Sequence, residues 1–316
     1  MKDSQDDSLK AFEKYYQREY DYDTTALSEP DINQIRQLAM EKRVLYGMRA
    51  PIGENIFDLI SSQNPSIRYE SIDFNSDDVD AILYICSGEN AKSYIVLNSK
   101  RPLVNQIFAT AHEYYHFIHD YEEIKKNPCI CDFKSLDSLM EKRASRFAAE
   151  LLLPTDALKA EIQFYEEKLE TKQMDFDLLD YGALSIFLLT KYQLPLKSIF
   201  YRFHEEGLLK KAVEEVIQDY ELIKRIVNEI VGSEMFDVIN RLYSSSNPHI
   251  SNESLEYKQI RNAYDLGNAS REEILEDSRI LNLDESHIAS FFDSIEEDDE
   301  ELSPEQLKNL SNLWRK

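Results

Sequence analysis

Residues 112–116 read His-Glu-Tyr-Tyr-His, an HExxH motif that constrains the fold more than any other part of the sequence. In an α-helix, residues four apart lie about one turn apart on the same face, so His112 and His116 can point at one metal ion. Glu113 lies close to that face and can accept a proton from a water molecule that zinc activates. The motif therefore predicts a helix here and indicates a zinc hydrolase.

A catalytic zinc ion usually has three protein ligands and one open position, so another element must supply a third ligand. A second predicted helix, about 136–153, offers Glu141, which shares a face with Ser145 and Ala148. Glu150 lies nine residues after Glu141 and points roughly the opposite way. On this pattern alone, Glu141 is either the third ligand or an ordinary surface carboxylate.

Three segments of the sequence resemble the ImmA/IrrE family of zinc metallopeptidases, and the likeness covers about residues 32–210. The family pattern is a strand that ends in Asn, then an Ala-His-Glu helix, then Glu-x-x-Ala-Asn-x-Phe-Ala with an apolar run and Pro. The matching segments are Ile95–Asn98, Phe108–Glu113 with His116, and Glu141–Pro154.

The resemblance implies a gluzincin-like site in which His112, His116 and Glu141 hold Zn²⁺ and Glu113 is the general base. Members of this family cleave helix-turn-helix transcriptional repressors of mobile elements or stress responses, so the resemblance implies the same activity here. The family often has a small residue where this chain has Tyr115, and Asn where it has Ser145. Neither difference removes a ligand, but both can alter the shape and hydrogen bonding of the site.

The composition excludes some classes of protein. The chain is 42% hydrophobic and 30% charged, which suits a folded protein, and its formal net charge is −24. That charge repels nucleic acid and anionic lipid but favours a basic protein partner, and a DNA-binding repressor fits this description. No signal peptide, transit peptide or membrane-spanning stretch is expected, and three cysteines fit a reducing cytosol. We therefore expect a cytoplasmic protein that binds neither membranes nor nucleic acid directly.

The expected fold class is α+β: a zincin-like core with a small sheet and active-site helices, followed by a mostly helical C-terminal region. The predicted strands, with a Gly-Glu-Asn turn signal between the last two, are 67–74, 81–86 and 94–97. The predicted helices include 103–119, 136–153, 178–191, 196–204 and 212–230. The expected domains are a flexible acidic arm (1–28), the zinc peptidase core with appended helix-turn-helix-like helices (29–215), and a helical domain with an acidic segment (216–316).

Other residues could contribute to the site. His119 lies about 10 Å along the helix from His112, so we expect it to support a ligand or lie at the surface. Candidates for a group that stabilises an oxyanion are His204, Tyr181, Tyr192 and Tyr201, and the sequence does not choose among them. Cys129 and Cys131 are separated by one residue, a poor spacing for a zinc knuckle, and we expect free thiols.

Two functional alternatives stay open. The peptidase fold could serve as a catalytically weak sensor or sequestering module, or the same chemistry could serve a toxin-antitoxin or phage-defence system. For an active peptidase, we expect a substrate strand to pair with a sheet edge near 94–97. The helices within 179–209 have a helix-turn-helix look, but the sequence favours packing against the core over contact with nucleic acid.

Overall fold

The chain divides into two compact units, Met1–Ile250 and Ser251–Lys316. The computed structural model describes residues 27–44, 46–74, 79–86, 92–126, 138–170, 172–209, 233–244, 263–264, 269–280, 288 and 292. Residues 1–26 and 210–232 lie outside this set, so the expected domain limits at 28 and 215 stay predictions, as does the helix at 212–230.

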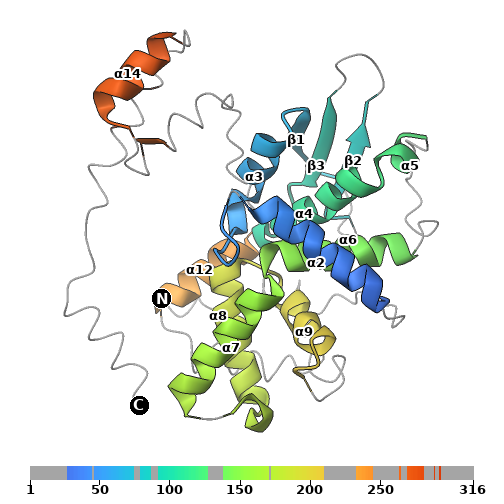
Figure 1. Ribbon diagram of the computed structural model, residues 1–316, viewed down its shortest axis with the longest axis vertical. Coiled ribbons are helices and arrows are strands. Elements are labelled where there is room, and N and C mark those ends of the chain that lie inside the picture. The colour runs from blue at the N-terminus through green and yellow to red at the C-terminus, as the bar shows by residue number, and fades with distance from the viewer. Residues whose placement is uncertain are drawn as a thin grey trace. The chain divides into compact units, whose positions relative to one another are not determined.

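A three-stranded mixed sheet forms one layer of the first unit (Figure 1), which confirms the α+β class. Its strands are β1 (Ile67–Ile72), β2 (Ala81–Ile85) and β3 (Ser93–Asn98), in the order β1-β3-β2. β3 pairs in parallel with β1 and antiparallel with β2. Alternate residues such as Leu83 and Ile95 are buried, because a pleated strand directs every second side chain to the core face.

Helices pack on the buried face of this sheet. The short helices η1 (Gly53–Asn55) and α3 (Ile56–Gln63) precede β1, and α4 (Leu103–His119) follows β3 after Pro102. α4 packs against β2, β3 and α3, and α5 (Tyr121–Lys126) continues the chain. The predicted helix at 103–119 is therefore confirmed at both ends.

Two further helices enclose α4. The helix α6 (Ser138–Leu152) packs along α4, and α2 (Glu29–Arg43), which begins after the N-cap Ser28, runs across α6 (Figure 1). Phe147 of α6 contacts Tyr114 and Tyr115 of α4, with ring centroids 6.3 and 5.3 Å away. Ala144, Phe147 and Leu151 form a buried apolar stripe along α6, and Phe147 fixes this stripe against α4.

The remaining described elements of the first unit are helices. It contains α7 (Thr155–Leu169), η2 (Gln173–Asp175), α8 (Leu178–Tyr192), α9 (Leu196–Glu205) and α12 (Ser233–Tyr243). Leu196, Ile199, Phe200 and Phe203 of α9 are buried, so this helix packs into the core as expected. In the described part of the chain, no helix combines the length and apolar character needed to cross a bilayer.

The second unit contains α14 (Arg271–Ile280). Ile274 of this helix is buried together with Ile288 and Phe292, and the Tyr264 ring packs edge-on against Phe292 at a centroid distance of 4.9 Å. This small apolar cluster gives the unit its own core.

A buried ion network ties α2, α6 and α9 together. Arg202 of α9 is fully buried and lies 3.0 Å from the Glu150 carboxylate of α6. Arg146 of α6 and Arg36 of α2 both pair with Glu206, at 2.7 and 2.6 Å. Because buried charges without partners are costly, this network is stable only when all three helices are in place.

We expect Glu150→Ala to lower the free energy of unfolding by about 3–5 kcal/mol, because it leaves the buried charges of Arg146 and Arg202 with one carboxylate fewer. It also removes the acceptor for the Thr155 backbone N–H at 2.7 Å. Urea unfolding measures the change. Lys172→Ala, at an exposed ion pair, is the control and should change stability by less than about 0.5 kcal/mol. Equal effects of the two substitutions would contradict the role of the network.

The network also predicts a pH dependence. Burial alone would raise the pKa of Glu206, but hydrogen bonds from Arg146 and Arg36 and the charge of Arg202 lower it to about 2. A lowered folded-state pKa stabilises the fold above the unfolded value of about 4.5, and this contribution disappears as the pH falls to about 2. Glu206→Gln should therefore cost roughly 3 kcal/mol at pH 7 and progressively less below pH 4.5. A cost that stays constant down to pH 2.5 in urea unfolding would contradict this assignment.

Candidate metal centre

α4 presents both histidines of the HExxH motif on one side. His116 is buried and His112 is half-buried, and their Nε2 atoms lie 3.1 Å apart. Their neighbours on the opposite side of the helix, such as Ala111 and Tyr114, are buried in the core. The amphipathic pattern of the helix therefore orients the two imidazoles together, as the four-residue spacing predicts.

α6 brings Glu141 to the same point. Its Oε2 lies 3.1 Å from His112 Nε2, and its Oε1 lies 3.4 Å from His116 Nε2. One ligand atom of each residue lies within 4.8 Å of those of the other two. The structure thus brings together all three predicted ligand residues from two helices.

The geometry fits a zinc ion. Zinc bonds of about 2.0–2.1 Å in tetrahedral directions place two ligand atoms about 3.3 Å apart, close to the three distances found here. Two imidazole nitrogens and a carboxylate that face one another also repel unless a proton or a cation lies between them. A divalent metal ion bound by these three side chains would remove this repulsion, so the residues present fit such an ion.

Hydrogen bonds orient the two imidazoles. His116 Nδ1 lies 2.8 Å from Asp120 Oδ2, and His112 Nδ1 lies 3.2 Å from the Ser145 hydroxyl. A proton on Nδ1 leaves the Nε2 lone pair for a metal. Ser145 therefore provides a hydrogen bond to the ligand at the position where the family often has Asn. Asp120 was missed by our sequence reasoning, although an acidic residue four positions after His116 was a usable signal.

His119 lies outside the ligand group. Its Nδ1 is 2.8 Å from Asp120 Oδ1, so one carboxylate joins His119 to His116. This arrangement agrees with the expected supporting position.

The surroundings favour positive charge at the centre. Burial alone would lower the pKa of His116, but hydrogen bonds with Asp120 and Glu141 raise it to about 10. Burial would likewise raise the pKa of Glu141, but hydrogen bonds with His112 and His116 bring it far below its usual range. A proton and a metal ion therefore compete for the same lone pairs.

Glu113 is not one of the three ligand residues, and its side chain faces β2. Burial raises the pKa of its carboxyl, an effect that the charges of His112 and His116 partly offset. The backbone of Leu83 in β2 also hydrogen-bonds this carboxyl. A raised pKa makes Glu113 a stronger base than an exposed glutamate.

The position of the sheet edge corrects one expectation. The segment 94–97 belongs to β3, which is the central strand, so it offers no free edge beside the site. Asn98 N donates to Asp80 O, and hydrogen-bonded pairs alternate along an antiparallel ladder, so the backbone of Leu83 points away from β3. The edge next to Glu113 is therefore β2. Strand order depends on tertiary packing, which the strand pattern does not encode.

The candidates for oxyanion stabilisation lie outside the ligand group. The Tyr181 hydroxyl donates to Leu208 O, and the Tyr192 hydroxyl donates to Glu161 at 2.7 Å. His204 is exposed on α9, and Tyr201 of the same helix is half-buried. Cys129 and Cys131 lie outside the described residues.

A comparison with protein-family models identifies one segment of the chain. Residues 63–204, which include all three ligand residues, match the IrrE N-terminal-like domain of a peptidase family. This segment is an IrrE N-terminal-like domain. The resemblance to the ImmA/IrrE family is thereby confirmed.

Two other comparisons give less information about the IrrE-like domain. No curated protein matches the chain. A solved Mycobacterium tuberculosis transcriptional regulator is similar, with 13% identity and a TM-score of 0.36 over 63% of this chain. The match spans 51% of that structure, and a likeness this distant carries no argument about function.

We expect the chain to bind one Zn²⁺, and we expect Asp120→Asn to weaken binding by about 10- to 100-fold, because it weakens the hydrogen bond that orients His116. Competition with a chromophoric chelator measures the affinity. Asp156→Asn, the same change at an exposed position of α7, is the control. Equal affinities of the Asp120 variant and the wild type would contradict the orienting role.

Proposed function

We propose that this chain is a zinc-dependent endopeptidase that hydrolyses one peptide bond in a specific cytoplasmic protein client. The observation that carries the proposal is the convergence of His112, His116 and Glu141 at 3.1–3.4 Å, with the Glu113 carboxyl beside them. The peptidase family of the domain supports the same reaction class.

Each residue of the site has its own role in the proposed reaction. His112, His116 and Glu141 would hold Zn²⁺, which when bound polarises a carbonyl and acidifies water. Glu113 accepts a proton from the attacking water and returns it to the leaving amine, and its raised pKa suits both transfers. Asp120 and Ser145 orient the imidazoles.

The substrate would bind as an extended strand along the outer edge of β2, which no strand among the described residues pairs with. By the alternation of the ladder, the backbone N–H and C=O groups of Ala81 and Ile85 point away from β3 and can pair with a peptide, and the N–H of Leu83 points the same way but bonds the Glu113 carboxyl. A peptide paired there lies beside Glu113, since Leu83 contacts its carboxyl. Edge pairing fixes the backbone of the substrate and leaves its side chains for selection.

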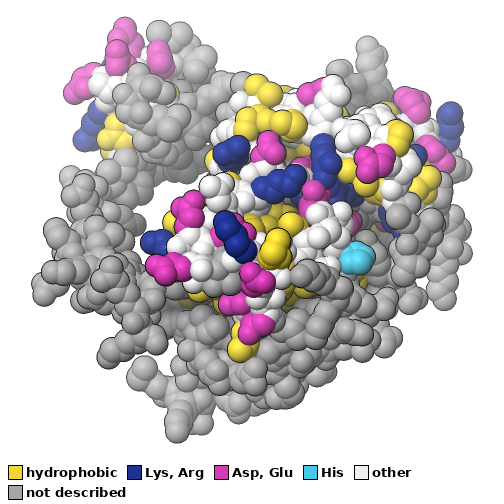
Figure 2. All heavy atoms as spheres, turned by 60° about the horizontal axis from the view of Figure 1, so that its bottom comes forward, with side chains coloured by type: hydrophobic (Ala, Val, Ile, Leu, Met, Phe, Trp, Pro, Cys, Tyr) yellow, Lys and Arg dark blue, Asp and Glu magenta, His cyan; other side chains and the backbone are white. Residues whose placement is uncertain are grey.

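We further propose that the client is a helix-turn-helix repressor. Two observations support this choice: the resemblance of the motifs to the ImmA/IrrE family, and a net charge of −24 that attracts a basic protein. Figure 2 shows Lys and Arg side chains interspersed with Asp and Glu side chains over the described residues of one face. On this face, the described residues form no continuous basic stripe of the kind that favours nucleic-acid binding.

Glu113→Gln should reduce cleavage of a cognate repressor by about 10²–10⁴-fold, because the amide cannot accept the proton, while Zn²⁺ binding is retained. The zinc-loaded chain is incubated with the product of a neighbouring repressor-like gene, and fragments are identified by mass spectrometry. Glu122→Gln, at an exposed carboxylate of α5, is the matched control. Unchanged cleavage by the Glu113 variant would refute this general base. Stoichiometric binding without cleavage by the wild type would favour a sequestering module instead.

A further inference from the structure

The end of α6 that carries Glu141 is less deeply packed than the rest of this helix. The apolar face of α6 becomes fully buried at Ala144, whereas residues 139–143 are half-buried. Glu141 lies in the first turn, where backbone N–H groups lack partners within a helix and the end of the helix can open. The direction of the Glu141 side chain therefore depends on what holds this turn in place.

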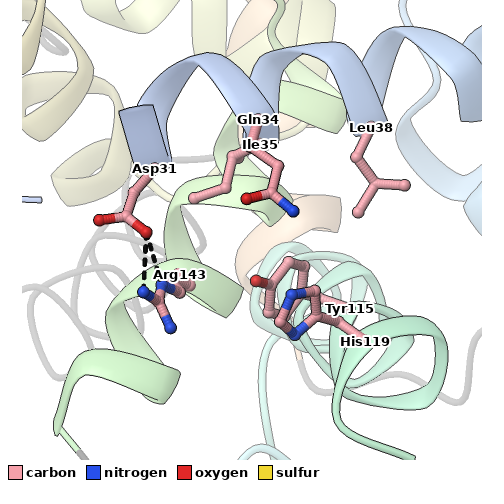
Figure 3. A pocket seen from close by; sticks show the side chains of 7 residues that line it. All are labelled: Asp31, Gln34, Ile35, Leu38, Tyr115, His119 and Arg143. Carbon is pink, nitrogen blue, oxygen red and sulfur yellow. Dashed lines mark hydrogen bonds and ion pairs between the residues drawn. The ribbon is translucent and has the colours of Figure 1, made fainter. Parts of the chain in front are cut away.

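An ion pair ties this end of α6 to α2. Arg143 lies two residues after Glu141, so it points to roughly the opposite side of α6. The Arg143 Nε and Nη2 atoms donate to Asp31 Oδ1 of α2, at 3.0 and 2.7 Å, and Figure 3 shows the two side chains facing each other from the two helices. Two charge-assisted hydrogen bonds hold a guanidinium more firmly than one contact does. The pair therefore restrains the start of α6 from the side away from the histidines.

Asp31 is itself held in position. It lies in the first turn of α2, and its Oδ2 accepts from the hydroxyl of the N-cap residue Ser28. Hydrogen bonds from Ser28 and Arg143 lower the pKa of Asp31, so its carboxylate is ionised at neutral pH. At the other end of α2, the buried Arg43 side chain donates to Leu151 O near the end of α6. α2 therefore holds α6 at both of its ends.

Apolar packing between the helices is incomplete next to this ion pair. A cavity of about 110 Å³ lies between α2, α4 and α6, and Leu38 and Tyr115 are among the residues that line it (Figure 3). Side chains that face a cavity lose the attraction of the atoms that would otherwise fill it. The pair of Asp31 and Arg143 therefore contributes more to the contact between α2 and this end of α6 than it would in a filled interface.

We infer that Asp31 is a positioning residue for the metal centre: by holding Arg143 against α2, it directs Glu141 toward the two histidines. Asp31 precedes residues 63–204, which match the family model, so this role lies outside the matched domain. The inference rests on the zinc site of the proposed function and not on cleavage. Zinc affinity therefore tests it separately from peptidase activity.

Neutral substitutions in the full chain separate positioning from simple electrostatics. Asp31→Asn removes a negative charge and Arg143→Gln removes a positive one, so electrostatics alone would shift Zn²⁺ affinity in opposite directions. Positioning predicts that each variant binds Zn²⁺ about two- to fivefold more weakly, because either change breaks the same partly exposed pair. The double variant should then bind no more weakly than either single variant. Competition with a chromophoric chelator measures the affinities, and shifts in opposite directions would overturn the inference.

Two further measurements separate positioning from a general effect on the fold. Lys172→Gln makes the same loss of positive charge at an exposed ion pair with Glu166, and this control should bind Zn²⁺ like the wild type. In a Glu141→Ala background, Arg143→Gln should no longer weaken zinc binding, because no carboxylate remains for the pair to direct. A loss of the same size in that background, or wild-type affinity in the single Arg143 variant, would overturn the positioning role.

Discussion

The packing of α6 between two charged centres is the constraint on which the site depends. One face of the helix carries Glu141 to the histidines of α4, and the other carries Arg146 and Glu150 into the buried network with α9 and α2. Phe147 packs between these faces on α4. Because the network is buried and makes these ion pairs only in one arrangement, it fixes the rotation of α6 and thereby the direction of Glu141.

Several electron-pair donors lie close together at the candidate metal centre. Two imidazole nitrogens and a carboxylate meet within hydrogen-bond distance, and Asp120 adds a second carboxylate behind His116. Such an arrangement is stable when it holds positive charge, which explains the raised pKa of His116 and the lowered pKa of Glu141. Glu113 has a different environment, since burial dominates and raises its pKa. Glu141 and Glu113 are the same type of residue, so their different surroundings make one a metal ligand and the other a base.

The sequence predicts those features that follow from periodicity. The spacing of His112 and His116, the face of Glu141 and the opposite direction of Glu150 all follow from 3.6 residues per turn, and the structure places them accordingly. Contacts between distant segments were not predictable in this way. The partner of Glu150 in α9 and the central position of β3 depend on how elements pack, which no local pattern encodes.

Anomalous diffraction at the zinc edge, from crystals of the zinc-loaded chain, tests the central claim most directly. The account predicts one strong peak about 2 Å from His112 Nε2, His116 Nε2 and a Glu141 carboxylate oxygen, with Glu113 close by but outside bonding distance. A peak at another position, or a Glu141 side chain turned away from the two imidazoles with metal present, would contradict it.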